Sequence, residues 1–339
     1  MIKTDIIIIG AGPVGLFAVF EAGLLKMKCH LIDILPKPGG QCIELYPKKP
    51  IYDIPAYPEI LAGDLIDNLL KQNSQFKPGF TLGEKAEKLI KNHDGSFNVI
   101  TDKGTVHTAP IVVIAGGLGG FQPRKPTFDG IQKFEDKGVL YFIREPQTFK
   151  DKNVIIAGGG DSALDWTIEL SKIAKKVTLI HRRNEFRGAP HTLIEIKKLS
   201  QQGKLSIKTP CELVSIEGDE SISSINIKNE DGKTEQIKTD NILSFFGLIM
   251  KLGPISEWGL GMENKVISVN SENFQTNKKG IFAVGDICSY PGKLKLILSG
   301  FHEVALASVE CFKRARPNEK YRFEFTTSSK TIQGRLGKK

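Results

Sequence analysis

The sequence repeats one plan twice, and this repeat limits the possible folds more than any other feature does. An apolar, β-branched run, Lys3–Ile9, ends in a glycine-rich turn, Gly10–Gly15. A second run, Asn153–Ala157, ends in a similar turn, Gly158–Ala163. Each turn is followed by a helix-like stretch and a further strand-like segment. This order is typical of nucleotide-binding units, so the repeat predicts an α/β protein with two Rossmann-like, three-layer domains.

Clusters of glycine and proline mark where one predicted domain is inserted into the other. The first cluster lies within residues 116–126 and the second within residues 245–254, and both have the composition of hinges. A chain of 339 residues is long enough for two separate cores. We expect a first nucleotide-binding domain of residues 1–118 and 247–339, with a C-terminal extension from about residue 315, and a second nucleotide-binding domain of residues 119–246.

The first glycine turn has the context of a dinucleotide site. Gly10 permits a tight turn, Gly12 lets the backbone approach a pyrophosphate, and Gly15 lets the helix pack on the strand. Pro13 lies within the same turn. Asp33 follows Gly10 by 23 residues, at the end of the next predicted strand, where its carboxylate can accept hydrogen bonds from ribose hydroxyls.

The second turn is followed by basic residues where the first is followed by an acid. Two guanidinium groups can bind a 2′-phosphate through paired hydrogen bonds, whereas a carboxylate would repel it. The sequence therefore predicts NADP rather than NAD at this turn. The candidate NADPH residues are Gly158, Gly160, Asp161, Ser162, Ala163, His181, Arg182, Arg183 and Arg187.

Two dinucleotide sites of this kind predict a flavoprotein with FAD in the first domain and NADPH in the second, between which a hydride passes. The five cysteines are scattered, with no pair closer than thirteen positions, which indicates neither a disulfide framework nor a metal site. These features favour a cytoplasmic enzyme. No apolar run is long enough to predict a membrane helix.

Three segments resemble the thioredoxin reductase group of FAD/NAD(P)H enzymes: Gly158–Ala163, His181–Arg183 and Gly280–Asp286. Thioredoxin reductases carry a Cys-x-x-Cys pair shortly before the second glycine turn, whereas this chain has 142-Phe-Ile-Arg-Glu-145 at that place. Without a dithiol, the chain cannot run the thioredoxin reductase reaction by that route.

The chain more closely resembles a sub-family of that fold, the thioredoxin-reductase-like (type 2) ferredoxin–NADP⁺ reductases of bacteria. The likeness covers essentially the whole chain. It implies a homodimer that passes electrons between NADPH and ferredoxin or flavodoxin through FAD. It rests on segments Gly39–Pro47, Ile51–Pro55, Ala62–Asp64, Asp161–Trp166, Phe245–Leu248 and Phe325–Ser328.

The same resemblance implies the residues of the flavin site. Tyr46 would stack on one face of the isoalloxazine, and Phe325 of the partner subunit would cover the other. Some family members have His in place of this phenylalanine. No protein acid or base is required. The FAD-binding residues implied are Asp33, Gln41, Tyr46, Ala86, Phe121, Asp286 and Thr327.

Alternative functions stay open at this point. The chain could be an NADPH-dependent flavoprotein reductase of a small disulfide or quinone, or a flavin redox sensor. The net charge of +9 is compatible with an acidic protein partner, an anionic membrane or nucleic acid. Because no stripe of basic and aromatic residues suggests a strand-binding groove, we expect an acidic electron carrier as the partner, and neither nucleic acid nor membrane.

Overall fold

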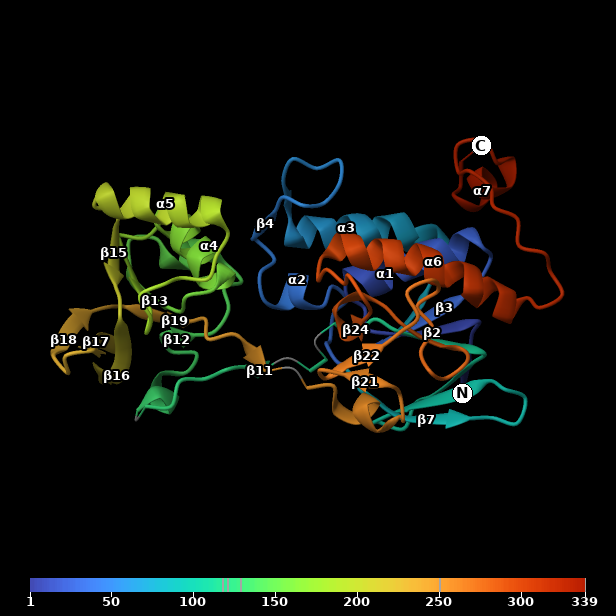
Figure 1. The fold of residues 1–339 in the computed structure, drawn as a ribbon, viewed down its shortest axis with the longest axis horizontal. Coiled ribbons are helices and arrows are strands. Elements are labelled where there is room, and N and C mark those ends of the chain that lie inside the picture. Colours follow the sequence, from blue (N-terminus) through green and yellow to red (C-terminus); the bar gives the residue numbers. More distant parts are fainter. Residues whose placement is uncertain (118, 121, 129, 250, 339) are drawn as a thin grey trace. The chain divides into compact units, whose positions relative to one another are not determined.

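The computed structural model describes residues 1–117, 119–120, 122–128, 130–249 and 251–338. The chain forms two compact units. The first unit comprises Met1–Gly120 and Met250–Lys339, and the second comprises Phe121–Ile249. Both ends of the chain belong to the first unit (Figure 1). Among the described residues, no helix combines the length and the apolarity that crossing a bilayer requires.

A five-stranded parallel sheet forms the centre of the first unit. The isoleucine run of its middle strand is buried on both faces. Ile6 and Ile8 pack into one apolar cluster, and Ile7 and Ile9 pack into another on the opposite face, because successive side chains of a strand alternate. The strands, in order across the sheet, are β23 (Ile281–Ala283), β10 (Ile111–Ile114), β2 (Ile6–Ile9), β3 (Cys29–Asp33) and β6 (Gly79–Leu82).

Different layers cover the two faces of this sheet. Three helices lie side by side over one face in Figure 1: α1 (Pro13–Leu24), α3 (Ala62–Asn73) and α6 (Ile297–Ala315). A second, four-stranded sheet covers the other face. Its strands, in order, are β1 (Ile2–Lys3), β9 (Val106–Ala109), β8 (Phe97–Thr101) and β7 (Ala86–Lys91).

The second unit repeats this plan with fewer elements. Ile155 and Ile242 of its parallel sheet pack against Ile225 and Ile227 of a three-stranded antiparallel sheet. The parallel strands, in order, are β12 (Val139–Leu140), β19 (Asn241–Ser244), β13 (Asn153–Ala157), β14 (Lys176–Ile180) and β15 (Leu205–Lys208). The helices are α4 (Asp161–Leu170) and α5 (Pro190–Gln201), and the antiparallel strands are β16 (Cys211–Gly218), β17 (Ile222–Asn229) and β18 (Thr234–Lys238).

Short elements complete both units. The short helices are α2 (Gln41–Glu44), α7 (Lys330–Arg335) and the 3₁₀ turns Ser74–Phe76, Ile131–Phe134, Pro146–Phe149, Gly253–Glu257 and Gly285–Ile287. The short strands are β4 (Pro50–Ile51), β5 (Ile60–Leu61), β11 (Gln122–Pro123), β20 (Leu248–Ile249), β21 (Met262–Glu263), β22 (Val266–Ser268) and β24 (Cys288–Ser289).

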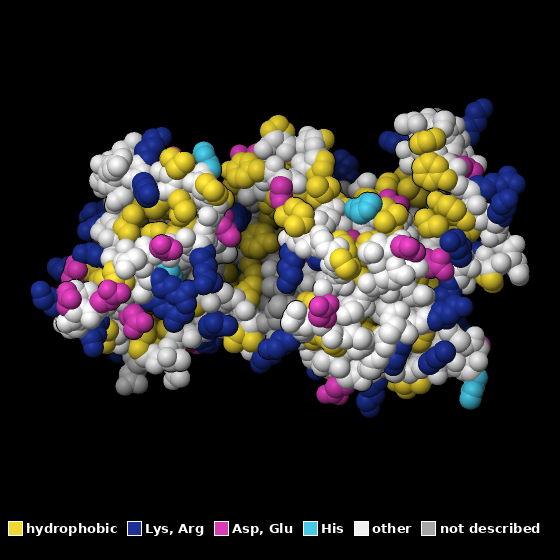
Figure 2. Space-filling model, in the orientation of Figure 1, with side chains coloured by type: hydrophobic (Ala, Val, Ile, Leu, Met, Phe, Trp, Pro, Cys, Tyr) yellow, Lys and Arg dark blue, Asp and Glu magenta, His cyan; other side chains and the backbone are white. Residues whose placement is uncertain are grey.

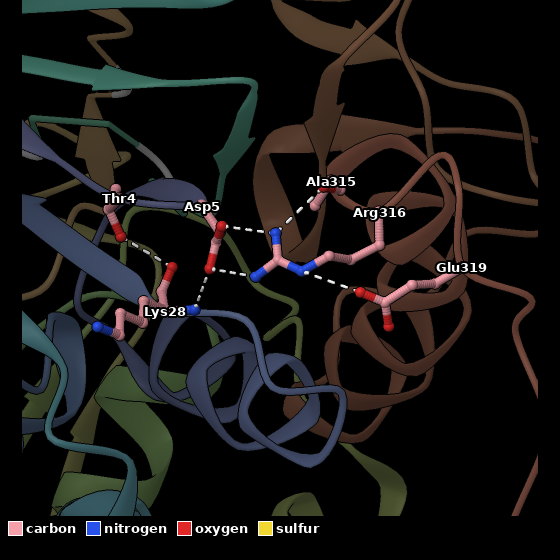
Figure 3. A network of polar contacts seen from close by, with 6 residues as sticks. All are labelled: Thr4, Asp5, Lys28, Ala315, Arg316 and Glu319. Carbon is pink, nitrogen blue, oxygen red and sulfur yellow. Dashed lines mark hydrogen bonds and ion pairs between the residues drawn. The ribbon is translucent and has the colours of Figure 1, made fainter.

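The C-terminal extension is tied to the first unit at both of its ends. Arg316, directly after α6, donates to both carboxylate oxygens of Asp5, at 2.9 and 3.1 Å (Figure 3). Burial opposes ionisation of Asp5, but the guanidinium holds its pKa below the ordinary value. At the other end, Arg335 donates to the carbonyl of Leu24, and the Ile332 side chain is buried. The segment between Arg316 and Arg335 is therefore fixed at both ends while its middle part is exposed to solvent.

Candidate functional site

Glycine backbone lines a cradle in the first unit. A Cβ added to Gly40 would lie 3.1 Å from the Cα of Gly12, so the two turns touch through backbone. Gly117 adopts φ +56°, and a Cβ added there would lie 3.7 Å from Nε2 of Gln41. Side chains at these glycines would fill the cradle. Their absence lets a pyrophosphate approach backbone N–H groups, which fits a dinucleotide.

The packing of α1 holds the first turn in place. A Cβ on Gly10 would lie 2.4 Å from the carbonyl oxygen of Ala115, and one on Gly15 would lie 2.0 Å from that of Gly10. Gly12 is the N-cap, Pro13 opens the helix, and no described side chain caps it. The free N–H groups of the first turn can therefore serve a phosphate.

Asp33 holds the loops around the cradle through its own carboxylate. Its Oδ2 accepts the backbone N–H of Ala11 at 2.6 Å, and its Oδ1 accepts that of Leu35 at 2.9 Å. Burial raises the pKa of Asp33, and the two backbone hydrogen bonds oppose that rise. Its own carbonyl accepts from Glu84, two residues before the buried Ala86. The remaining lone pairs of Asp33 can accept ribose hydroxyls.

Tyr46, Cys42 and Asp286 come together although Asp286 lies far along the chain. The Tyr46 hydroxyl and the Cys42 thiol are near enough to influence each other's pKa, and the Asp286 carboxyl influences the pKa of both groups. Burial raises the pKa of Tyr46 and raises that of Cys42 to about 11. Burial also raises the pKa of Asp286, against the opposing effect of Lys293 and Lys295. At neutral pH Cys42 is therefore a protonated thiol and not a nucleophile.

The structure does not bring the predicted C-terminal residues to Tyr46 within one chain. Phe325 is 65% exposed and packs edge-on against Phe323, with ring centroids 5.0 Å apart. Thr327 is exposed, and its carbonyl accepts from Gln333 at 2.8 Å. In Figure 1 the segment leading to α7 lies at the end of the first unit that is remote from α2. Phe121 lies outside the described residues.

The second glycine turn opens onto the start of α4. A Cβ on Gly158 would lie 2.6 Å from the carbonyl oxygen of Phe245 and 2.9 Å from Cβ of Ala163, which is fully buried. A Cβ on Gly160, the N-cap, would meet no described heavy atom within 4 Å. Ala163 thus acts through packing, while the neighbouring Asp161 and Ser162 are exposed in the first turn of α4.

The basic segment lies beside this second turn. The backbone N–H of Arg187 donates to the carbonyl of Gly159 at 2.7 Å. The His181 ring packs against Gly159, where an added Cβ would come within 2.4 Å of it. Burial, with a contribution from the nearby arginines, lowers the pKa of His181, so the ring is neutral at pH 7. Arg182 and Arg183 are exposed, and their guanidinium groups can reach a phosphate.

Two features of the first site escaped the sequence analysis. Gly117 belongs to the cradle, whereas we expected this glycine cluster only as a hinge. Glu303 is fully buried and accepts the N–H of Gly285 at 2.6 Å. In the sequence, Glu303 could have been noticed only as a single acidic residue within the apolar part of a predicted helix. That helix is α6, which begins at Ile297.

The chain is similar to known proteins over nearly its whole length. The family model described as pyridine nucleotide-disulphide oxidoreductase matches residues 4–308. A ferredoxin–NADP reductase of Flavobacterium johnsoniae is 57% identical over 330 residues, which are 97% of this chain and 94% of the relative. Another, of Pelagibacter ubique, is 54% identical over 339 residues, 100% of both chains.

A solved structure gives the same fold at lower identity. The thioredoxin reductase of Lactococcus lactis has a TM-score of 0.78 and 24% identity, covering 93% of this chain and 100% of its own. This likeness confirms the predicted two-domain α/β architecture.

Proposed function

The chain belongs to the pyridine nucleotide-disulphide oxidoreductase family, and within that family we propose that it is a ferredoxin–NADP⁺ reductase. It is an FAD enzyme that exchanges electrons between NADPH and ferredoxin, or flavodoxin. The observation that carries the proposal is the identity of 54% to a ferredoxin–NADP reductase over an alignment that covers 100% of this chain and 100% of the relative. A family match alone would fit many acceptors.

The first unit supplies groups that suit FAD. The backbone of the glycine cradle and the start of α1 would hold the pyrophosphate, and Asp33 would bind a ribose. Gln41 borders the cradle beside Gly117. The chemistry that bound FAD would supply there is acceptance of a hydride and release of electrons one at a time. Tyr46 would stack on the isoalloxazine and exclude water from that face, a contact worth about 1 kcal/mol.

The second unit supplies groups that suit NADPH. The N–H groups at Gly160 and the start of α4 would bind the pyrophosphate. Arg182, Arg183 and Arg187 would bind the 2′-phosphate, which NADH lacks. His181 would support this segment by packing against the turn, because its ring is neutral and lies on Gly159.

The exposed extension supports a homodimer in which each chain completes the site of the other. Phe325 and Thr327 belong to the segment leading to α7, which Arg316 and Arg335 tie down and which lies remote from α2, the helix just before Tyr46 (Figure 1). Covering the flavin from a partner subunit would bury the exposed Phe325 ring. The same contact would bring Thr327 to the cofactor.

The thiols argue against a disulfide as the acceptor. All five cysteines are free, and four of them are buried. Burial raises the pKa of the one nearest Tyr46, Cys42, to about 11, so it does not attack a disulfide at neutral pH. Free thiols also suit the reducing cytoplasm, where we place the enzyme.

The test combines cofactor content with acceptor specificity. The purified protein should carry FAD, be reduced by NADPH far faster than by NADH, and reduce cytochrome c only when a low-potential ferredoxin is added. Rapid reduction by NADPH without ferredoxin-dependent turnover would contradict the proposed acceptor. Turnover with a quinone in that case would favour the quinone reductase alternative.

A further inference from the structure

A buried ion pair lies next to the turn that carries Asp286. Glu303 is fully buried, and its Oε1 pairs with Lys293, whose side chain is 7% exposed. The hydroxyl of Tyr290 donates to the same oxygen at 2.8 Å, and the N–H of Gly285 donates to Oε2 at 2.6 Å. Removing two charges from water is costly, and the hydrogen bonds to both carboxylate oxygens of Glu303 offset part of that cost.

Helix α6, which carries Glu303, contacts both the first glycine turn and the Gly285 turn. A Cβ on Gly300 would lie 2.3 Å from the Val14 side chain, and one on Gly285 would lie 3.5 Å from it. Gly300 and Glu303 are neighbours on the surface of α6, three residues apart. Through these two positions α6 holds the first turn and the Gly285 turn, with φ +78° at Gly285, in one arrangement.

We propose that Glu303 and Lys293 are a positioning pair. They hold the Gly285–Asp286 turn against the first glycine turn and balance the charge beside the flavin. The inference rests on the proposed binding of FAD by Asp286. The closeness of Lys293 and Glu303 to the Asp286 carboxyl supports it, because the cation of Lys293 lowers the pKa of that carboxyl and the anion of Glu303 raises it.

The two charges make opposite predictions. Neutralising Glu303 leaves the cation of Lys293 unbalanced, which favours the more negative reduced flavin and raises its reduction potential. Neutralising Lys293 leaves the Glu303 carboxylate unbalanced and lowers the potential. A pair with only a structural role would weaken FAD binding in both variants without opposite shifts.

The experiment compares Glu303→Gln, Lys293→Gln and the double variant by spectroelectrochemical titration and by FAD affinity. We expect opposite shifts of at least about 30 mV in the single variants, equal to a tenfold change in relative affinity for reduced and oxidised flavin. The double variant should return towards the wild-type potential. Glu310→Gln and Lys313→Gln, an exposed pair on the same helix, are the matched controls and should not shift it. Shifts of one sign, or none, would overturn the proposal.

Two further variants separate charge from folding. Tyr290→Phe removes a hydrogen bond without a change of charge, so FAD affinity should fall while the potential stays. Should Glu303→Gln fail to fold, Lys293→Gln and the double variant still test the proposal. A potential that is lowered in Lys293→Gln and restored in the double variant supports the pair, whereas the same potential in these two variants refutes it. None of these measurements uses ferredoxin. A protein that binds FAD but does not turn over ferredoxin would refute the acceptor and leave this inference intact.

Discussion

At the scale of single residues, Asp33 has a structural role in addition to its proposed binding of a ribose. Its carboxylate accepts two backbone N–H groups, and removing it leaves both donors, one of them buried, without their partner. We expect Asp33→Ala to weaken FAD binding by at least tenfold and to destabilise the apoprotein by about 2 kcal/mol. Fluorescence titration with FAD and urea unfolding measure the two effects. Asp67→Ala, at an exposed position of α3, should change neither.

The exposed arginines of the second unit are predicted to select the coenzyme. Replacing Arg182 and Arg183 by Ala should lower kcat/KM for NADPH by about 10- to 100-fold, because charge-assisted hydrogen bonds to the 2′-phosphate are lost. The value for NADH should hardly change. Lys172→Gln, which removes an exposed charge from the same unit, is the control. An equal loss for both coenzymes would contradict the assignment.

At the scale of elements, a buried polar chain joins the two sheets of the first unit. His30 on β3 contacts Thr81 on β6 at 2.8 Å, and Thr81 contacts His107 on β9 at 2.9 Å. Burial, with the nearby His107, lowers the pKa of His30 to about 4, and burial lowers the pKa of His107 as well. Both rings are therefore neutral in the folded protein at pH 7.

The buried contacts of His30, Thr81 and His107 predict that the folded protein loses stability in mild acid. The unfolded chain takes up these protons near pH 6.5, whereas folded His30 does so only near pH 4, so stability should fall as the pH drops through this window. The shift at His30 corresponds to about 3 kcal/mol at most. Urea unfolding of the apoprotein between pH 7.5 and 4.5 should show the slope, reduced in His30→Gln and kept in the exposed His93→Gln. An unchanged slope in His30→Gln would refute this cause.

At the scale of the whole molecule, the proposed dimer makes a prediction about mixed chains. Tyr46→Ala and Phe325→Ala should each be impaired as homodimers. If the two side chains of one site come from different subunits, a heterodimer has one doubly altered site and one wild-type site. Refolding the two variants together should therefore recover turnover, whereas mixing without subunit exchange should not. No recovery on co-refolding would show that each chain completes its own site.

The net charge of +9 is also a property of the whole molecule, and it affects how fast the protein meets a charged partner. Long-range attraction speeds the encounter with an acidic carrier and is screened by salt. We expect kcat/KM for ferredoxin to fall by about tenfold between 50 and 500 mM salt. Turnover with an uncharged quinone at the same salt concentrations is the control. An equal fall of kcat/KM with salt for ferredoxin and for the quinone would contradict electrostatic steering.

Local pattern in the sequence determined the parallel sheets and the two glycine turns. The run Ile6–Ile9 is apolar throughout because both of its faces are covered, and Gly10 and Gly15 follow it at the spacing that a strand–turn–helix unit requires. These are short-range effects, so they could be read from neighbouring residues. The thioredoxin-reductase-like fold and the family were predicted from resemblance in further segments, among them Gly158–Ala163 and Gly280–Asp286.

Only the tertiary structure decided which distant residues share a site. Asp286 lies 240 positions after Tyr46 yet beside it, because β23 joins the sheet next to β10. The burial of Glu303 with Lys293 depends on α6 packing over the first turn, which no local pattern encodes. Conversely, the segment that carries Phe325 is anchored by Arg316 and Arg335 and lies at the end of the first unit remote from α2 (Figure 1). Contacts between residues so far apart depend on how the elements pack, and packing exists only in the folded chain.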